Sequence, residues 1–363
     1  MVDKVSIGIV GCGNISEIYL EQARTFDILK VDAVCDLVPA LADAKAAAHR
    51  IPKSYYAIED ILADPEIEII VNLTPPAAHA SVALRALEAG KSIYNEKPLA
   101  ILLEDAQCLL RLAKEKGLRV GCAPDTFLGA GLQTCRKLID EDAIGEPVGG
   151  AAFMMRHGPE DWHPSPEFFY QAGGGPLFDV GPYYLTALVS LLGPVQGVSG
   201  LARITFPERV IGSLPKRGQK IHVEVPTHVN ALLEFASGIT GIFTTSFDVW
   251  HSDLPFIEIY GSQGTLSVPD PNTFGGPVVL RKPYAAAGKI IPLLPLREHN
   301  SRSLGVADMA AAMREGHPHR ANGELAYHVL DIMHTIHSSS QQKRHLALES
   351  TCERPAPLGL DAF

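Results

Sequence analysis

The sequence predicts an α/β domain with a doubly wound parallel sheet, followed by an α+β domain whose sheet is open and mostly antiparallel. Two observations predict these folds. Up to residue 123, short apolar runs alternate with amphipathic helical patterns, whereas beyond residue 124 strand-like runs follow one another closely. We therefore expect a first domain at residues 1–123, a second at residues 124–350 and a C-terminal tail at residues 351–363.

The composition is that of a globular chain with enough residues for two cores. The chain has 363 residues, of which 46% are hydrophobic, and a formal net charge of −10. An acidic chain without a basic face argues against a nucleic-acid partner, and its longest apolar run is too short to cross a membrane. The six cysteines lack the spacing of metal or redox sites. We therefore expect a reduced, cytoplasmic protein, and no signal peptide because a strand-like run follows Met1 almost directly.

In the first domain, each strand is predicted by a short apolar run and each helix by apolar residues at helical spacing. The expected strands are residues 5–10, 31–36, 67–73, 91–95 and 119–123. The expected helices are residues 14–26, 39–49, 77–89 and 102–116. Apolar strands separated by helices are typical of a parallel sheet covered on both faces, which binds its ligand at the carboxyl ends of the strands.

In the second domain, a helix at residues 129–141 is followed by strand-like runs joined by turn residues. The expected strands are residues 148–156, 195–205, 222–236, 239–248, 255–260 and 264–268, with hairpin turns at Ser237-Gly238 and Ser262-Gln-Gly264. An apolar helix is expected to begin near Asp179. Residues 269–300 are rich in Pro and Gly and predict a long loop, and two helices follow near residues 303–315 and 323–338.

The most informative motif is a glycine turn between the first strand and the first helix. Gly11 permits the tight turn, and Gly13 lets the backbone come close to a bulky anion. Ser16 stands where a small residue is needed for the helix to pack on the strand. Asn14 and Ile15 open the helix, whose free N–H groups and positive dipole end suit a pyrophosphate. The pattern predicts a dinucleotide site, although an ordinary strand–helix turn would also use glycine.

The next strand ends in an acid that indicates which dinucleotide binds. Asp36 lies 25 residues after Gly11, where a carboxylate can accept hydrogen bonds from the adenosine ribose hydroxyls. Leu37 and Val38 follow, with no Arg or Lys to hold a 2′-phosphate. This favours NAD over NADP. The alternative interpretation of Asp36 is a solvated residue at a strand end.

Three further segments carry residue types suited to catalysis. They are Asn72-Leu-Thr74-Pro75-Pro76-Ala-Ala-His79, Asn95-Glu96-Lys97-Pro98 and Gly173-Gly-Gly-Pro-Leu-Phe-Asp179-Val-Gly-Pro-Tyr183-Tyr184. Lys97 follows a strand end, where it can donate to a substrate oxygen or act on a proton. Asp179 and Tyr183 are four residues apart, so their side chains can share a helix face. The alternatives are a surface lysine, a helix N-cap and a core aromatic residue.

These motifs, in this order, resemble the glucose–fructose oxidoreductase / inositol dehydrogenase / rhizopine catabolism (Gfo/Idh/MocA) family over nearly the whole chain. Ile259-Tyr-Gly-Ser-Gln-Gly-Thr265 and Asn322-Gly-Glu-Leu-Ala are similar to family segments as well. The resemblance implies a Rossmann domain, an open antiparallel sheet that often makes the oligomer contact, and oxidation of a sugar or cyclitol hydroxyl or the reverse reduction. A homo-oligomer, dimer or tetramer, is therefore expected, with a small sugar or polyol as substrate.

The resemblance also implies roles for individual residues. Lys97 matches the family lysine beside the substrate hydroxyl and the nicotinamide, and Asp179 matches the aspartate that pairs with it. Tyr183 stands where the family most often has a histidine base, so we expect it to take the alcohol proton. A tyrosine has an ordinary pKa near 10, so a positive neighbour such as Lys97 must lower it. If Tyr183 only packs, Lys97 carries the proton instead.

The remaining candidates for the cofactor follow the strands that the resemblance places around the nucleotide. They are Thr74, Pro75, His79 and Glu96. Pro76 departs from the family, which often has Asn there.

For the substrate, Trp162 can stack on a sugar face and His163 can bind hydroxyls, or both can simply anchor a Pro-rich loop. Asp125 and Thr126 are weaker candidates of the same kind. His334 and His337 have a spacing that can suit a metal, but no carboxylate or cysteine completes the set, so no metal is expected.

Two alternative functions stay open at this stage. One is an NADPH-linked reductase of a keto-sugar or related carbonyl. The other is a non-catalytic regulator that senses nucleotide on the same fold. The sequence does not identify the sugar.

Overall fold

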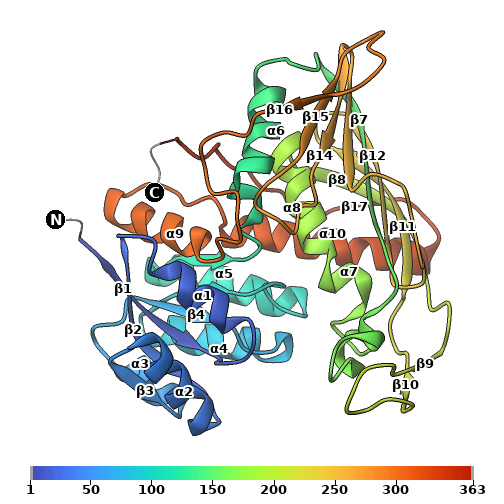
Figure 1. Ribbon diagram of the computed structural model, residues 1–363. Coiled ribbons are helices and arrows are strands. Elements are labelled where there is room, and N and C mark those ends of the chain that lie inside the picture. The colour runs from blue at the N-terminus through green and yellow to red at the C-terminus, as the bar shows by residue number, and fades with distance from the viewer. Residues whose placement is uncertain (1–2, 361–363) are drawn as a thin grey trace. The chain divides into compact units, whose positions relative to one another are not determined.

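The computed structural model describes residues 3–360, which form two compact units (Figure 1). The first unit contains the chain up to Gly129, the segment Pro295–Tyr327 and the residues from Pro355 onward. The second contains Ala130–Leu294 and His328–Arg354. The first segment of the first unit ends at Gly129. However, each unit also takes a later segment of the chain, which the simple division at residue 123 did not anticipate.

The first unit is a six-stranded parallel sheet in the order β3-β2-β1-β4-β5-β6, the doubly wound Rossmann arrangement that the sequence predicted. Its strands are β1 (Val5–Val10), β2 (Leu29–Cys35), β3 (Lys53–Tyr55), β4 (Ile69–Asn72), β5 (Ser92–Asn95) and β6 (Val120–Cys122). Its helices are α1 (Ser16–Ala23), α2 (Pro39–His49), α3 (Ile58–Ala63), α4 (Pro76–Glu88), α5 (Leu103–Lys116) and α9 (Leu304–Glu315). The crossovers from β1 lead to β2 and β3 on one side and to β4, β5 and β6 on the other. Because each crossover is right-handed, the helices cover both faces of the sheet.

Burial explains why these runs form central strands. Every residue of β4 and β5 is buried, as expected for strands covered on both faces. Helix α5 buries a stripe that includes Leu109 and ends at Gly117, whose φ of +65° stops the helix in the left-handed region. Two short elements, β3 and α3, were not predicted.

Helix α9 belongs to the first unit, although the sequence assigned its residues to the second domain. It packs against α1 and β6. Arg314 near its end holds Glu68, just before β4, through two N–H···O bonds of 2.7 Å each. A bidentate arginine–carboxylate pair fixes orientation as well as distance. This pair therefore ties a late segment of the chain to the early sheet.

The second unit is built on a nine-stranded sheet in the order β16-β15-β14-β13-β7-β12-β11-β8-β17. The strands are β7 (Pro147–Met155), β8 (Val195–Arg203), β11 (His228–Phe235), β12 (Thr240–Ser246), β13 (Ile257–Gly261), β14 (Gly264–Val268), β15 (Val278–Arg281), β16 (Lys289–Ile291) and β17 (Leu346–Ala347). Strands β7 and β12 pair in parallel, and the other neighbours pair antiparallel. The predicted open, mostly antiparallel sheet is confirmed, with β15 and β16 lying inside the segment predicted as a loop.

One face of this sheet carries helices and the other is open. Helices α6 (Ala130–Asp140), α7 (Gly175–Asp179) and α8 (Gly181–Leu192) pack against its strands, and α10 (Gly323–Gln342) belongs to the same unit from His328 onward. Strand β11 alternates between buried residues such as Leu233 and exposed ones such as Leu232. A period of two is typical of a strand with one covered face.

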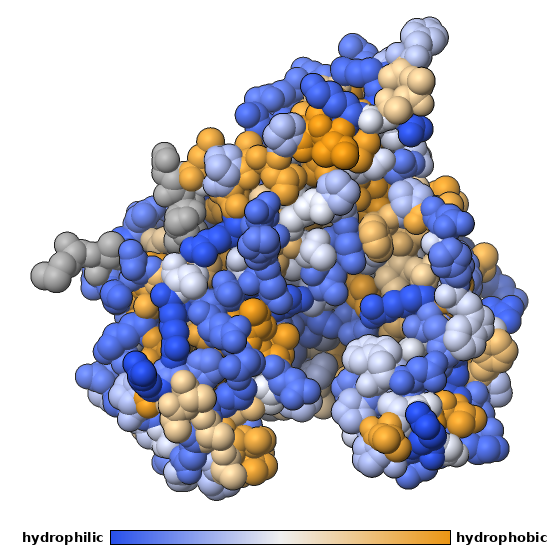
Figure 2. Space-filling view, in the orientation of Figure 1, coloured by the Kyte–Doolittle hydropathy of each residue, from blue (hydrophilic) through white to orange (hydrophobic). Residues whose placement is uncertain are grey.

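A separate two-stranded hairpin, which the sequence did not predict, projects from the second unit. It pairs β9 (Glu208–Val210) with β10 (Lys220–His222), and we call residues 208–222 the β9–β10 arm. Figure 1 labels the arm by its strands β9 and β10. At the same place, Figure 2 shows apolar residues among polar ones at the surface. Leu214 on the arm is 70% exposed.

Further features of the structure concern long apolar helices, the cysteines and the clustering of metal-ligand side chains. None of the helices in residues 3–360 is both long enough and apolar enough to cross a membrane. All six cysteines are free; Cys108 and Cys352 are partly exposed and the other four are buried. In the described part of the chain, no group of three His, Cys, Asp or Glu side chains is arranged to hold a metal. The rings of His334 and His337 instead contact Phe178.

Candidate functional site

The glycine turn after β1 has the geometry that the sequence predicted. Gly11 has a φ of +100°, and its N–H donates to the carbonyl oxygen of Cys35 at 2.8 Å. A Cβ at Gly11 would lie 2.8 Å from the backbone of Leu73. Only glycine therefore fits, because it tolerates both the positive φ and the close approach to the segment that follows β4.

The start of α1 leaves room for an anion. Gly13, Asn14 and Ile15 are exposed, and a Cβ built on Gly13 meets no atom within 4 Å. No side chain caps the helix. The Ser16 hydroxyl instead donates to the Gly13 carbonyl at 2.6 Å, which braces the turn. Uncapped N–H groups at a helix start are suited to a phosphate, so these residues fit the pyrophosphate of NAD.

Asp36 is held at the carboxyl end of β2 by the backbone. One carboxylate oxygen accepts the Cys12 N–H and the other accepts the Val38 N–H, each at 2.8 Å. Each oxygen keeps a second lone pair for a hydroxyl donor. Leu37 beside it is 85% exposed and carries no charge. Asp36 and Leu37 therefore fit the ribose of NAD, whereas the Asp36 carboxylate would repel the 2′-phosphate of NADP.

The segment after β4 is fixed by a buried histidine. The Nδ1 of His79 lies 2.7 Å from the carbonyl oxygen of Pro98, and its Nε2 lies 2.8 Å from that of Thr74. Burial lowers the pKa of His79. Because a neutral imidazole has one N–H, the ring donates to one of these carbonyls. His79 thus links the loop carrying Thr74 and exposed Pro75 to the loop after β5.

The segment after β5 presents Lys97 at the same sheet edge. The Glu96 carboxylate is buried, accepting the Tyr19 hydroxyl at 2.7 Å on one oxygen and the Lys97 backbone N–H at 2.9 Å on the other. The Lys97 side chain is only partly buried. Glu96 therefore orients the backbone that carries Lys97, and Tyr19 on α1 connects that backbone to the glycine turn.

Asp125, a weaker substrate candidate, has a structural role in the first unit. Its carboxylate accepts the N–H groups of Ser303 at 3.2 Å and Gly305 at 2.9 Å at the start of α9. The side chain is 1% exposed, and burial raises its pKa to about 6. Thr126 is buried as well.

In the second unit, Asp179 and Tyr183 lie at the junction of two helices. Asp179 is the last residue of α7 rather than the N-cap of α8, because Val180 separates the helices. It is partly exposed, and Tyr183, in the first turn of α8, is 8% exposed. The Nη2 of Arg156 lies 3.9 Å from the Asp179 carboxylate.

Arg156, which pairs with Asp179, was not among the predicted site residues. It follows β7 and is separated from Asp179 by more than twenty positions of the chain. No spacing pattern links the two residues. Helix α7 packs against β12, the strand beside β7, and this packing brings them together.

Trp162 and His163 lie on the loop of residues 156–170 that Arg156 opens. Trp162 is 61% exposed. Its ring meets His163 edge to face with centroids 5.5 Å apart, and it contacts Phe169 at 6.4 Å. The carbonyl oxygen of His163 accepts the Ser213 hydroxyl. The loop thus holds both predicted side chains at the surface by way of an aromatic cluster.

Comparison with protein families gives two matches. A model described as "Oxidoreductase family, NAD-binding Rossmann fold" matches residues 5–123. A model described as "GFO/IDH/MocA C-terminal domain" matches residues 132–267. The two matches follow one another along the chain and correspond to the parallel sheet and to much of the antiparallel one.

Curated relatives include several dehydrogenases. Trans-1,2-dihydrobenzene-1,2-diol dehydrogenase of Bos taurus is 25% identical over 316 residues, covering 85% of this chain and 87% of that protein. Levoglucosan dehydrogenase of Pseudarthrobacter phenanthrenivorans is 25% identical over 293 residues, covering 73% of each. Inositol 2-dehydrogenase of Salmonella typhimurium is 33% identical over 144 residues, covering 39% of this chain and 43% of that protein.

Solved structures share the fold. An NAD binding oxidoreductase from Klebsiella pneumoniae has a TM-score of 0.84 at 21% identity, covering 95% of this chain and 99% of that one. Levoglucosan dehydrogenase in complex with NADH and L-sorbose has a TM-score of 0.83 at 20% identity, covering 96% and 99%.

Proposed function

Because the chain belongs to the Gfo/Idh/MocA family of NAD-binding oxidoreductases, we propose that it transfers hydride between NAD and the hydroxyl carbon of a sugar or cyclitol. The names of its relatives, which include dehydrogenases of levoglucosan and inositol, support this class of substrate. One observation carries the proposal. Gly11, Asp36 and Lys97 follow β1, β2 and β5 at the carboxyl edge of one parallel sheet, where such sheets bind ligands.

In the proposed reaction, each chemical group of the site has its own task. Bound NAD supplies the hydride acceptor. The N–H groups around Gly13 hold the pyrophosphate, and Asp36 holds the ribose. Thr74 and Pro75 border the nucleotide, and His79 and Glu96 act by fixing the loops.

The proton is handled by three further residues. The Lys97 ammonium donates to the substrate hydroxyl oxygen and stabilises negative charge that develops there. Tyr183 takes the hydroxyl proton in its phenolate form and becomes a neutral phenol. Asp179 supplies the negative charge that, by the family resemblance, complements the Lys97 ammonium.

The test is a panel of pyranoses, inositols and sugar acids incubated with NAD, with absorbance at 340 nm as the readout. We expect turnover of at least one compound. Replacement of Lys97 by Met removes the charged donor, so kcat falls by about 10²–10⁴-fold while the Kd for NAD changes little. Lys116→Met, an exposed lysine at the end of α5, is the matched control. Normal turnover by the Lys97 variant contradicts the proposal.

Tyr183→Phe tests the proton carrier separately, because it removes one hydroxyl group and keeps the ring. We expect a lower kcat and loss of the acid-side limb of the pH profile, because in wild type kcat falls as the pH drops through the pKa of the proton acceptor. A wild-type rate and profile would make Tyr183 a packing residue and assign the proton to Lys97.

We also propose that the chain forms a homo-oligomer through the open face of the second unit's sheet, and that it works in the cytoplasm. Leu232 and Ile242 are directly paired across β11 and β12 and are 60% and 49% exposed. Leu201, on β8, is 70% exposed. Apolar side chains grouped on one sheet face are typical of an interface. The six free cysteines support a reducing compartment.

A further inference from the structure

Two loops of the second unit each present an exposed tryptophan. The first loop is residues 156–170, after β7, and carries Trp162. The second loop is residues 247–256, between β12 and β13, and carries Trp250, which is 78% exposed. These are the only two tryptophans of the chain. Tryptophan side chains offer large amphipathic surfaces for contact with a ligand or partner, so what holds the two loops in place matters.

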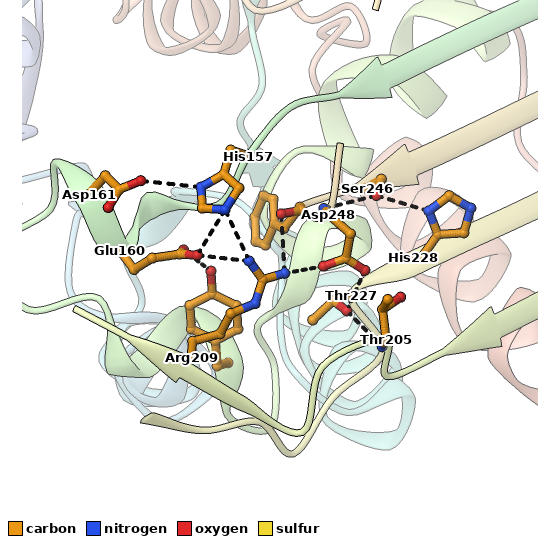
Figure 3. A network of polar contacts seen from close by, with 11 residues as sticks. His157, Glu160, Asp161, Thr205, Arg209, Thr227, His228, Ser246 and Asp248 are labelled. Carbon is orange, nitrogen blue, oxygen red and sulfur yellow. Dashed lines mark hydrogen bonds and ion pairs between the residues drawn. The ribbon is translucent and has the colours of Figure 1, made fainter. Parts of the chain in front are cut away.

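Arg209, on the β9–β10 arm, binds both loops at once (Figure 3). Its Nη1 donates to Glu160 of the first loop at 2.8 Å. Its Nη2 donates to the carbonyl oxygen of Phe247 at 3.2 Å and to the carboxylate of Asp248, both of the second loop. Arg209 is 6% exposed and Glu160 is 2% exposed. A rigid guanidinium fork buried between two carboxylates fixes the separation of the segments that carry them.

A second connection joins the same two loops. The ring of His157 stacks on Trp250 with centroids 3.8 Å apart and planes 13° apart. His157 and Asp248 also form an isolated antiparallel bridge between their backbones. The Nε2 of His157 lies 3.4 Å from Nη1 of Arg209, and its Nδ1 lies 3.3 Å from the Asp161 carboxylate (Figure 3). Arg209 therefore also supports the ring on which Trp250 rests.

The arm is bound to the first loop by more than Arg209. The backbone N–H groups of Gly212 and Ser213 donate to the carbonyl oxygen of Glu160 at 3.0 and 3.1 Å. The Ser213 hydroxyl donates to the carbonyl oxygen of His163, the residue after Trp162. These bonds fix the arm against the loop that carries the candidate sugar-binding residues Trp162 and His163, and we call them the brace.

The first loop begins beside the candidate catalytic aspartate. Arg156, its first residue, lies 3.9 Å from Asp179. We propose that Arg209 is a positioning residue for substrate binding. It fixes the loops that carry Trp162 and Trp250, so that both aromatic side chains are already ordered when the sugar binds. This inference rests on the proposed function. Fixing a loop before binding raises affinity because less conformational entropy is lost on binding.

The kinetic test compares Arg209→Met with Arg354→Met, using the best sugar of the panel. Arg354 is a partly buried arginine of the same unit that pairs with Asp140 and therefore controls for general destabilisation. In the Arg209 variant we expect KM for the sugar to rise at least tenfold, with kcat within about threefold of wild type and the Kd for NAD unchanged. Arg209→Lys keeps the charge without the fork, so its KM should be intermediate.

The physical test uses tryptophan fluorescence, which needs no substrate. Because Trp162 and Trp250 are the only tryptophans, the decay of emission anisotropy reports the mobility of these two loops alone. We expect a larger nanosecond component in Arg209→Met than in wild type or Arg354→Met. If Arg209→Met does not fold, Ser213→Ala weakens the same brace and should raise KM and mobility in the same direction.

The outcomes separate this inference from the proposed function. Failure of the wild-type enzyme to reduce NAD with any compound of the panel contradicts the proposed function. Wild-type turnover together with an unchanged sugar KM in the folded Arg209 variant, or in Ser213→Ala where Arg209→Met does not fold, overturns the inference alone. A rise in KM accompanied by an equal rise in Arg354→Met also overturns it, because the effect would then be general destabilisation.

Discussion

At the scale of single residues, Gly11 occupies the turn after β1 and Asp36 the carboxyl end of β2. Both positions could be predicted from the sequence because they depend on near neighbours in the chain, a strand, a turn and a helix. Arg209 was not found, because its partners Glu160 and Asp248 lie 49 and 39 positions away. A buried ion pair between distant segments leaves no periodic signal.

Gly11→Ala and Gly13→Ala should separate folding from cofactor binding. At Gly11 a Cβ would lie 2.8 Å from backbone atoms at a φ of +100°, so Ala should cost about 1–3 kcal/mol of unfolding free energy and abolish NAD binding. At Gly13 a Cβ meets no protein atom within 4 Å, so Ala should leave stability near wild type and weaken NAD binding. Chemical denaturation and NAD titration measure both effects. Equal stability of the two variants contradicts the account.

Asp36 should control the choice of cofactor. Its carboxylate accepts two backbone N–H groups and would repel a 2′-phosphate, so the Kd for NAD should be at least about tenfold lower than that for NADP, a difference of about 1.4 kcal/mol. Asp36→Ser should bring the Kd for NADP closer to the Kd for NAD. A wild-type preference for NADP, measured by titration of both nucleotides, would reverse this assignment.

At the scale of elements, the longer helices and the apolar buried strands were predicted, including the three-residue strand β6, whereas short strands with polar residues were not. The alternation up to β6 gave the parallel sheet and its helices. The strands β3, β9, β10 and β16 have three residues each, too few to show a period. Helix α9 was recognised, but its place in the first unit depends on long-range partners such as Glu68 and Asp125.

The capping of α9 by Asp125 should make stability depend on pH. Burial raises its pKa to about 6 from an ordinary 3.8, so the fold favours the protonated carboxyl. This contribution is complete below about pH 4 and is lost as the pH rises through 6. It amounts to about 3 kcal/mol. Asp125→Asn keeps an acceptor and removes the titration. In denaturant unfolding from pH 4 to 7.5, the free energy of unfolding of the wild type should fall relative to that of the variant. Parallel plots of this free energy against pH would contradict the prediction.

At the scale of the whole molecule, buried histidines in both units should lower the stability of the fold in acid, which is opposite to the effect of Asp125. Burial lowers the pKa of His319 and of His328 to about 4. His328 Nε2 accepts the Val195 N–H, which protonation would break. Because the folded pKa lies below the unfolded one, each contribution is complete above about pH 6.5 and is lost as the pH falls through 4. His328→Gln should therefore reduce the loss of stability in acid, measured by circular dichroism between pH 3.5 and 7. An unchanged acid midpoint contradicts this.

The open sheet face should decide the oligomeric state. Leu232→Asp places a charge among apolar neighbours, so we expect dissociation toward monomer by light scattering after size exclusion. Glu234→Asp, on the same strand and conservative, is the control. A wild-type chain that is already monomeric at micromolar concentration rules out this interface.

The central claim is that Lys97 and Asp179 serve one reaction. The most direct measurement is a double-mutant cycle of kcat/KM with Lys97→Gln, Asp179→Asn and the combined variant, with NAD and the best sugar. Groups that act as a unit are non-additive, so the account predicts that the combined variant is about as slow as the slower single variant. Losses that multiply across the two positions would show that the residues act independently and would contradict the account.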